Sequence, residues 1–133
     1  METRILGTTE ADIRLAAEMI QKGGLVAFPT ETVYGLGADA LNAEAVGKVY
    51  AAKGRPSDNP MIVHIAQKSD MNKLTDGITP EVERLMEAFW PGPLTMVVPA
   101  KDVIPKVTTG GLATVGVRMP EDAIARALIS AAG

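Results

Sequence analysis

A basic loop leads into an apolar strand near the middle of the chain, and it reads Lys53-Gly54-Arg55-Pro56-Ser57-Asp58-Asn59-Pro60-Met61-Ile62-Val63-His64-Ile65. Gly54 allows a backbone bend in which a side chain would clash, and the two prolines fix φ. Lys53 and Arg55 together form an anion clamp, because a guanidinium grips two oxygens at once while an ammonium acts as a point charge. The alternative interpretation is a solvated turn, since short basic motifs often arise by chance.

The segments around this loop predict an α/β fold. Asn42 can cap a helix over 43–52 that buries one apolar face. The apolar run 25–28 precedes this helix, and the run 61–65 follows the basic loop. This order predicts a strand–helix–strand crossover, with the first strand covered on both faces.

The rest of the chain predicts further elements of the same kinds. Thr9 can cap a helix over 10–22, and Thr79-Pro80-Glu81 is typical of a helix start. We expect the second of these helices to bury a stripe made of Val82, Leu85, Met86 and Phe89. Strands are expected at 5–6 (a short edge strand), 94–98 and 114–118, and a last helix from about 121. A loop with a short helical turn is expected at 67–77, and irregular chain at 101–109. Four central strands with interleaved helices indicate one α/β domain.

Bulk composition excludes several classes of protein. The 133 residues suffice for one domain, and the net charge of −3 argues against a protein that coats nucleic acid through its overall charge. The chain has no cysteine and one histidine, so neither a disulfide nor a zinc site of its own is expected. No apolar run reaches membrane-spanning length, and the polar start is not that of a signal peptide, so we expect a cytoplasmic protein with no membrane contact.

Polar groups gather at the expected ends of strands. Residues 29–37 carry two threonines, a glutamate and a tyrosine beside two glycines. This composition is as typical of a surface turn as of a ligand site at the end of a strand. The cations Lys53, Arg55 and Arg118 suit a ligand with several negative charges, such as a nucleoside triphosphate with a carboxylate co-substrate. His64 is either a general base or a structural hydrogen-bonding residue.

Four segments of the chain resemble the YrdC family of threonylcarbamoyl-AMP synthases. They read Pro29-Thr30-Glu31-Thr32-Val33-Tyr34-Gly35-Leu36-Gly37, Lys53-Gly54-Arg55-Pro56 with Asn59-Pro60, Trp90-Pro91-Gly92-Pro93-Leu94-Thr95, and Val115-Gly116-Val117-Arg118-Met119-Pro120. The resemblance implies a YrdC-like domain with a twisted mixed sheet, flanking helices and a large basic cavity. It also implies the synthesis of L-threonylcarbamoyladenylate from L-threonine, bicarbonate and ATP, with Mg²⁺ bound mainly through the ATP phosphates. A downstream transferase complex then passes the threonylcarbamoyl group to tRNA.

The resemblance also implies a role for individual residues. Lys53 and Arg55 correspond to the catalytic Lys-x-Arg element. Lys53, Arg55, Asn59 and Thr114 correspond to ATP-binding residues, and no protein ligand to a metal is implied. The positions that correspond to L-threonine-binding residues are Thr32, His64 and Arg118.

One departure from the family pattern concerns the end of the chain. The family continues with a Ser-x-Asn element that this sequence does not contain, so residues 1–133 are expected to be the N-terminal major part of the domain, with its end missing and its activity reduced. Two alternatives stay open. One is a non-catalytic module that binds tRNA or double-stranded RNA. The other is a carbamoyl-adenylate-forming domain of the kind used in hydrogenase maturation.

Overall fold

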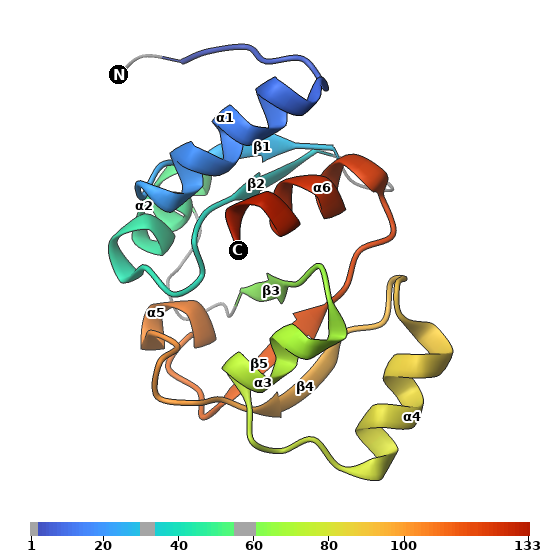
Figure 1. Cartoon of the computed structure of the whole chain (residues 1–133). Coiled ribbons are helices and arrows are strands. Elements are labelled where there is room, and N and C mark those ends of the chain that lie inside the picture. Colours follow the sequence, from blue (N-terminus) through green and yellow to red (C-terminus); the bar gives the residue numbers. More distant parts are fainter. Residues whose placement is uncertain (1–2, 30–33, 55–60) are drawn as a thin grey trace.

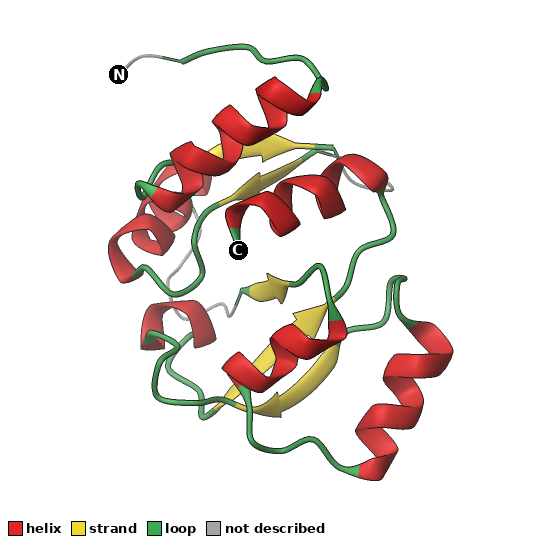
Figure 2. Cartoon of the chain, in the orientation of Figure 1, coloured by secondary structure: helices red, strands yellow, loops and turns green. Residues whose placement is uncertain are grey.

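The strands of the computed structural model form two separate sheets, which Figures 1 and 2 show in the same view. The structure describes residues 3–29, 34–54 and 61–133. Strands β1 (Val26–Phe28) and β2 (Gly35–Gly37) form an antiparallel hairpin. In the second sheet, β5 (Thr114–Arg118) lies between β3 (Ile62–His64), to which it is parallel, and β4 (Met96–Pro99), to which it is antiparallel. The predicted α/β class and mixed sheet are therefore confirmed.

Helices pack against both sheets. They are α1 (Glu10–Gln21), α2 (Ala43–Lys53), η1 (Lys68–Asp70), α3 (Met71–Leu74), α4 (Pro80–Phe89), α5 (Lys106–Thr109) and α6 (Ala123–Ala132). In Figure 1, α1 and α6 lie on the side of the hairpin, and α3 and α4 lie on the side of the three-stranded sheet. No helix in the described ranges is both long enough and apolar enough to cross a bilayer.

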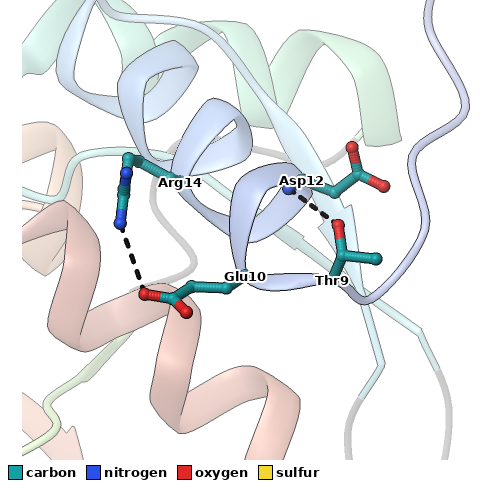
Figure 3. Close-up of polar contacts among 4 residues, drawn as sticks. All are labelled: Thr9, Glu10, Asp12 and Arg14. Carbon is teal, nitrogen blue, oxygen red and sulfur yellow. Dashed lines mark hydrogen bonds and ion pairs between the residues drawn. The ribbon is translucent and has the colours of Figure 1, made fainter.

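Helix α1 begins where the sequence predicts. The Thr9 hydroxyl accepts a hydrogen bond from the Asp12 amide at 3.2 Å, and Glu10 pairs with Arg14 one turn later at 3.3 Å (Figure 3). A cap of this kind satisfies an amide that has no partner within the helix. The Asp12 carboxylate in turn accepts from the Gly7 amide at 2.8 Å, which joins the preceding segment to the first turn.

The three-stranded sheet has one buried face and one open face. Side chains alternate along each strand, and those of the buried face belong to Val63, Met96, Val98, Val115 and Val117. They pack with Met71 and Leu74 of α3, Met86 of α4 and Trp90 in the main core. The alternate residues form the open face and are partly or fully exposed: Ile62, His64, Val97, Pro99, Thr114, Gly116 and Arg118.

A smaller core joins the two ends of the chain. Ala16 and Ala17 of α1 pack against Leu128 of α6, with Val26 and Phe28 of the hairpin at its edge. The side-chain amide of Gln21 also donates from Nε2 to the carbonyl of Ala132 at 3.1 Å. Helix α6 thus holds α1 and the hairpin together.

Two predictions near the N-terminus are wrong. Residues 5–6 form no strand, and Ile5 is 99% exposed, because no neighbouring strand lies beside it in the described chain. The predicted crossover is not formed, since the chain turns back after β1 and pairs with β2, a strand that the sequence did not reveal. A hairpin needs only a short connection, whereas a parallel pair needs a long one. Ala27 is exposed as a result, so β1 is not covered on both faces.

The predicted stripe of α4 is wrong in part. Met86 is 5% exposed, but Leu85 and Phe89 are 40% and 55% exposed. Trp90, immediately after the helix, is 4% exposed and takes the core position one turn beyond Met86. The core therefore receives the row Val82, Met86 and Trp90, which the spacing of four residues places on one side. Segment 67–77 contains the predicted short helical turn, as η1 and α3, whereas segment 101–109, expected to be irregular, contains α5.

The α4 correction leads to a test with two matched variants. We expect Met86→Ala to lower the free energy of unfolding by about 2–5 kcal/mol, because it leaves a cavity in the main core. Phe89→Ala, one turn away on the exposed side, should cost less than about 1 kcal/mol. Urea unfolding followed by circular dichroism measures both, and equal losses would contradict the observed orientation of the helix.

Candidate functional site

A cavity of about 410 Å³ lies between the hairpin, α2, α6 and strand β3. Apolar side chains such as Phe28, Val49 and Leu128 form much of its wall. Its polar side chains include Lys53, His64, Asp39 and Asp70. A concave site with a few convergent polar groups is typical of a small-molecule site.

Lys53 reaches this cavity from the C-terminal end of α2. The helix ends at Gly54, which has a left-handed conformation (φ 64°), and the Gly54 amide donates to the carbonyl of Ala51 at 3.3 Å. Glycine adopts this conformation at little cost, so the helix stops with Lys53 at the cavity.

His64 reaches the same cavity from β3. Its Nδ1 lies 3.2 Å from the carbonyl oxygen of Ile62. Because a carbonyl only accepts, Nδ1 carries the proton in this contact, and Nε2 is the acceptor of the neutral ring. Lys53 and His64, eleven positions apart in sequence, are therefore brought to one cavity.

A polar row crosses the open face at the level of His64. Strand pairing sets His64 beside Arg118 of β5. Met96 pairs with Val117, so the antiparallel register continued by one residue sets Thr95 opposite Arg118. The Arg118 guanidinium donates to the Thr95 hydroxyl from Nε at 3.0 Å and from Nη2 at 2.7 Å.

Arg118 and Thr114 do not line the cavity itself. Thr114 lies opposite Pro99 at the start of β5 and shares the open face with Arg118. Four residues of strand separate the two by about 13 Å. The structure thus groups Lys53 with His64, and His64 with Arg118, whereas Thr114 stands at the far end of the same strand.

Three predicted site residues lie outside the described residues, and they are Thr32, Arg55 and Asn59. Their roles in the site therefore stay predictions from sequence.

Two threonines near the site were missed by sequence reasoning. Thr108 of α5 is fully buried and lines the cavity; its hydroxyl donates to the Ala40 carbonyl at 2.7 Å, and its own carbonyl accepts from the Met61 amide at 2.9 Å. It thereby joins the segments before α2 and β3. Thr95 contacts Arg118, and its only sequence signal is its place at the end of the Trp90–Thr95 motif.

The two cavity carboxylates are engaged within the protein. Asp39 accepts from the Leu41 amide at 3.0 Å, and Asp70 accepts from the Gln67 amide at 3.3 Å and pairs with Lys73 at 3.4 Å. Among the residues that the structure describes, no group of three or more His, Asp or Glu side chains is arranged to hold a metal ion.

A family model described as "Telomere recombination" (Sua5_yciO_yrdC) matches residues 18–133. The chain belongs to the Sua5/YciO/YrdC family. The predicted resemblance to the YrdC family is therefore confirmed.

Similar members of the Sua5/YciO/YrdC family carry a common name. The chain is 57% identical to the threonylcarbamoyl-AMP synthase of Pyrococcus abyssi, over 90% of this chain and 35% of the relative. It is 50% identical to that of Bacillus subtilis, over 96% of this chain and 37% of the relative. The crystal structure of P. abyssi Sua5 complexed with L-threonine matches with a TM-score of 0.90 and 54% identity, over 98% of this chain and 37% of that one. The chain thus spans little more than a third of the length of these relatives.

The contact between His64 and Ile62 leads to a prediction about the tautomer of the neutral ring. We expect the proton on Nδ1, because the carbonyl at 3.2 Å accepts from that atom. Long-range ¹⁵N–¹H NMR above pH 8 reads the tautomer directly, and the assignment is unambiguous because the chain has one histidine. A ring protonated on Nε2 in the folded chain would contradict this geometry, and the urea-unfolded chain serves as the reference.

Proposed function

We propose that this chain forms the substrate-binding part of an L-threonylcarbamoyladenylate synthase, a nucleotidyltransferase that uses L-threonine, bicarbonate and ATP. The observation that carries the proposal is the meeting of Lys53 and His64 at one cavity, with Arg118 paired beside His64. These residues come from α2, β3 and β5, and they provide two cations and an imidazole for anionic ligands. The names of the similar family members support the same activity.

In this proposal L-threonine binds near the polar row of the open face. Arg118 pairs with the carboxylate of the amino acid, since a guanidinium matches two carboxylate oxygens. His64 contacts the same substrate, and Thr32 completes the threonine site as a prediction from sequence. Support comes from the solved Sua5 structure, whose title names L-threonine.

ATP binds with its phosphates near Lys53. Arg55, Asn59 and Thr114 are the further ATP-binding residues that we propose, the first two from sequence alone. Among the described residues, the cavity carboxylates Asp39 and Asp70 have partners within the protein. We therefore propose that Mg²⁺ enters with the triphosphate rather than in a carboxylate cage of the chain.

The proposed reaction needs alignment and charge more than an activated nucleophile. The threonine amine adds to bicarbonate, and loss of water gives an N-carboxylate. An oxygen of that carboxylate attacks the α-phosphorus of ATP, and pyrophosphate leaves with the electron pair of the broken P–O bond. Lys53 and Arg55 stabilise the negative charge on the phosphates, and no covalent intermediate with the protein is required.

Two further parts of the proposal concern the place of this chain in a YrdC-like domain and the step that follows the reaction. Residues 1–133 correspond to the major N-terminal part of a YrdC-like domain in longer relatives. The adenylate passes to a threonylcarbamoyl transferase complex that acts on tRNA in the cytoplasm. Direct binding of tRNA or double-stranded RNA by this chain is the alternative that the RNA titration below tests.

Pyrophosphate release tests the proposed activity. With ATP, L-threonine and bicarbonate present, we expect release that falls to background when either threonine or bicarbonate is omitted, because each contributes atoms to the nucleophile. The P. abyssi synthase serves as the positive control. Pyrophosphate release that continues when threonine is omitted and when bicarbonate is omitted would refute the synthase assignment. In a separate titration, tight RNA binding without affinity for ATP would favour the RNA-binding alternative.

Two single variants test whether L-threonine and ATP contact different residues of the site. We expect Arg118→Ala to weaken L-threonine binding about tenfold or more and to leave ATP binding nearly unchanged, because a charge-assisted contact is lost. Lys53→Ala should show the opposite pattern. Titration calorimetry measures both ligands. The exposed residues Arg126 and Lys68, which do not line the cavity, give the control variants Arg126→Ala and Lys68→Ala. Equal losses of both ligands in both site variants would show that the division is wrong.

A further inference from the structure

The Thr95 side chain accepts two hydrogen bonds from the guanidinium of Arg118. Two N–H groups on the same edge of that guanidinium converge on the Thr95 hydroxyl oxygen, at 3.0 and 2.7 Å. A guanidinium carries five N–H donors in a rigid plane, so holding the Nε–Nη2 edge sets the direction of the neighbouring Nη1–Nη2 edge. Both residues are partly buried, where a charged group gains more from a hydrogen bond than in bulk water.

Thr95 is itself held from two sides. The turn before it is closed by Trp90, whose indole N–H donates to the Leu94 carbonyl at 2.8 Å while the ring is buried in the core. The same turn is tied to the end of β5, because the Gly92 amide donates to the Met119 carbonyl at 2.9 Å. The turn that precedes Thr95 is therefore fixed both internally and to the residue that follows Arg118.

Gly116 makes room for the Thr95 methyl group. A Cβ atom at this position would lie 3.2 Å from Thr95 Cγ2 and 3.9 Å from Ile62 Cγ1, and the first distance is tighter than ordinary packing. Because Gly116 lies two residues before Arg118 on the same face, the glycine, the threonine and the arginine form one unit across β4 and β5.

We propose that Thr95 is a positioning residue, which orients Arg118 so that the neighbouring edge of its guanidinium, formed by Nη1 and Nη2, receives the carboxylate of the amino-acid substrate. This inference rests on the proposed function and adds a residue to it. Thr95 acts through Arg118 and needs no contact with the substrate. Without the hydroxyl, the Nε–H and Nη2–H groups of Arg118 would lose the oxygen atom that accepts from both of them. The guanidinium would then be free to rotate away from the substrate carboxylate.

The test compares three variants of the same chain. Thr95→Val removes the hydroxyl and keeps the shape, while Thr95→Ser keeps the hydroxyl. Thr109→Val makes the same chemical change at a buried threonine of α5, whose hydroxyl donates to Lys106 and not to Arg118. Calorimetry gives the dissociation constants for L-threonine and ATP, and NMR gives the solvent exchange rate of the Arg118 Nε–H.

We expect Thr95→Val to weaken L-threonine binding about tenfold and to accelerate Arg118 Nε–H exchange, while ATP binding stays at the wild-type level. Thr95→Ser should restore both properties, and Thr109→Val should change neither. Wild-type threonine affinity in Thr95→Val, or an equal loss of ATP affinity, would overturn the positioning role.

Failure of the proposed function gives a different result. A wild-type chain that does not bind L-threonine would refute the amino-acid site, and the role of Thr95 in orienting Arg118 toward it would fall as well. Unchanged Arg118 exchange in Thr95→Val, with threonine binding intact in the wild type, would overturn the inference alone.

Discussion

The hydrogen-bonded register of strand β5 is the constraint on which the site depends. Its parallel pairing to β3 sets His64 beside Arg118, and its antiparallel pairing to β4 sets Thr95 opposite the same arginine. A shift by one residue would turn every side chain of the strand to the other face. Val115 and Val117 would then leave the core and Arg118 would enter it, at a cost that a domain of this size could not bear. Burial of the valines thus fixes the place of the arginine.

The cavity depends on contacts between elements that are far apart in the chain. Helix α6 packs on α1 and contributes Leu128 to the cavity wall, while Thr108 joins the segments that precede α2 and β3. None of these contacts involves the polar residues that we propose to bind substrate. The walls can therefore be packed for stability while Lys53 and His64 line the same cavity with polar groups, a separation that is common in ligand sites.

Charge is distributed in a way that fits this arrangement. The chain is acidic as a whole, with a net charge of −3, yet the site residues named from sequence are mostly basic or neutral. The two acidic side chains that line the cavity are held by backbone amides, and one also by Lys73. Neutralised or engaged carboxylates repel an anionic ligand less than free ones would, because their charge is partly compensated at short range.

The sequence by itself determined the local features. It indicated the caps Thr9, Asn42 and Thr79, the strands near 26–28, 62–64, 96–99 and 114–118, and the polar residues His64 and Arg118, since spacing and capping chemistry act over a few residues. Tertiary structure alone decided the pairing of the strands. It placed β1 and β2 in their own sheet, turned Trp90 rather than Phe89 into the core, and brought Thr95 to Arg118. These outcomes depend on which distant surfaces bury one another, and periodicity along one segment carries no information about its partner.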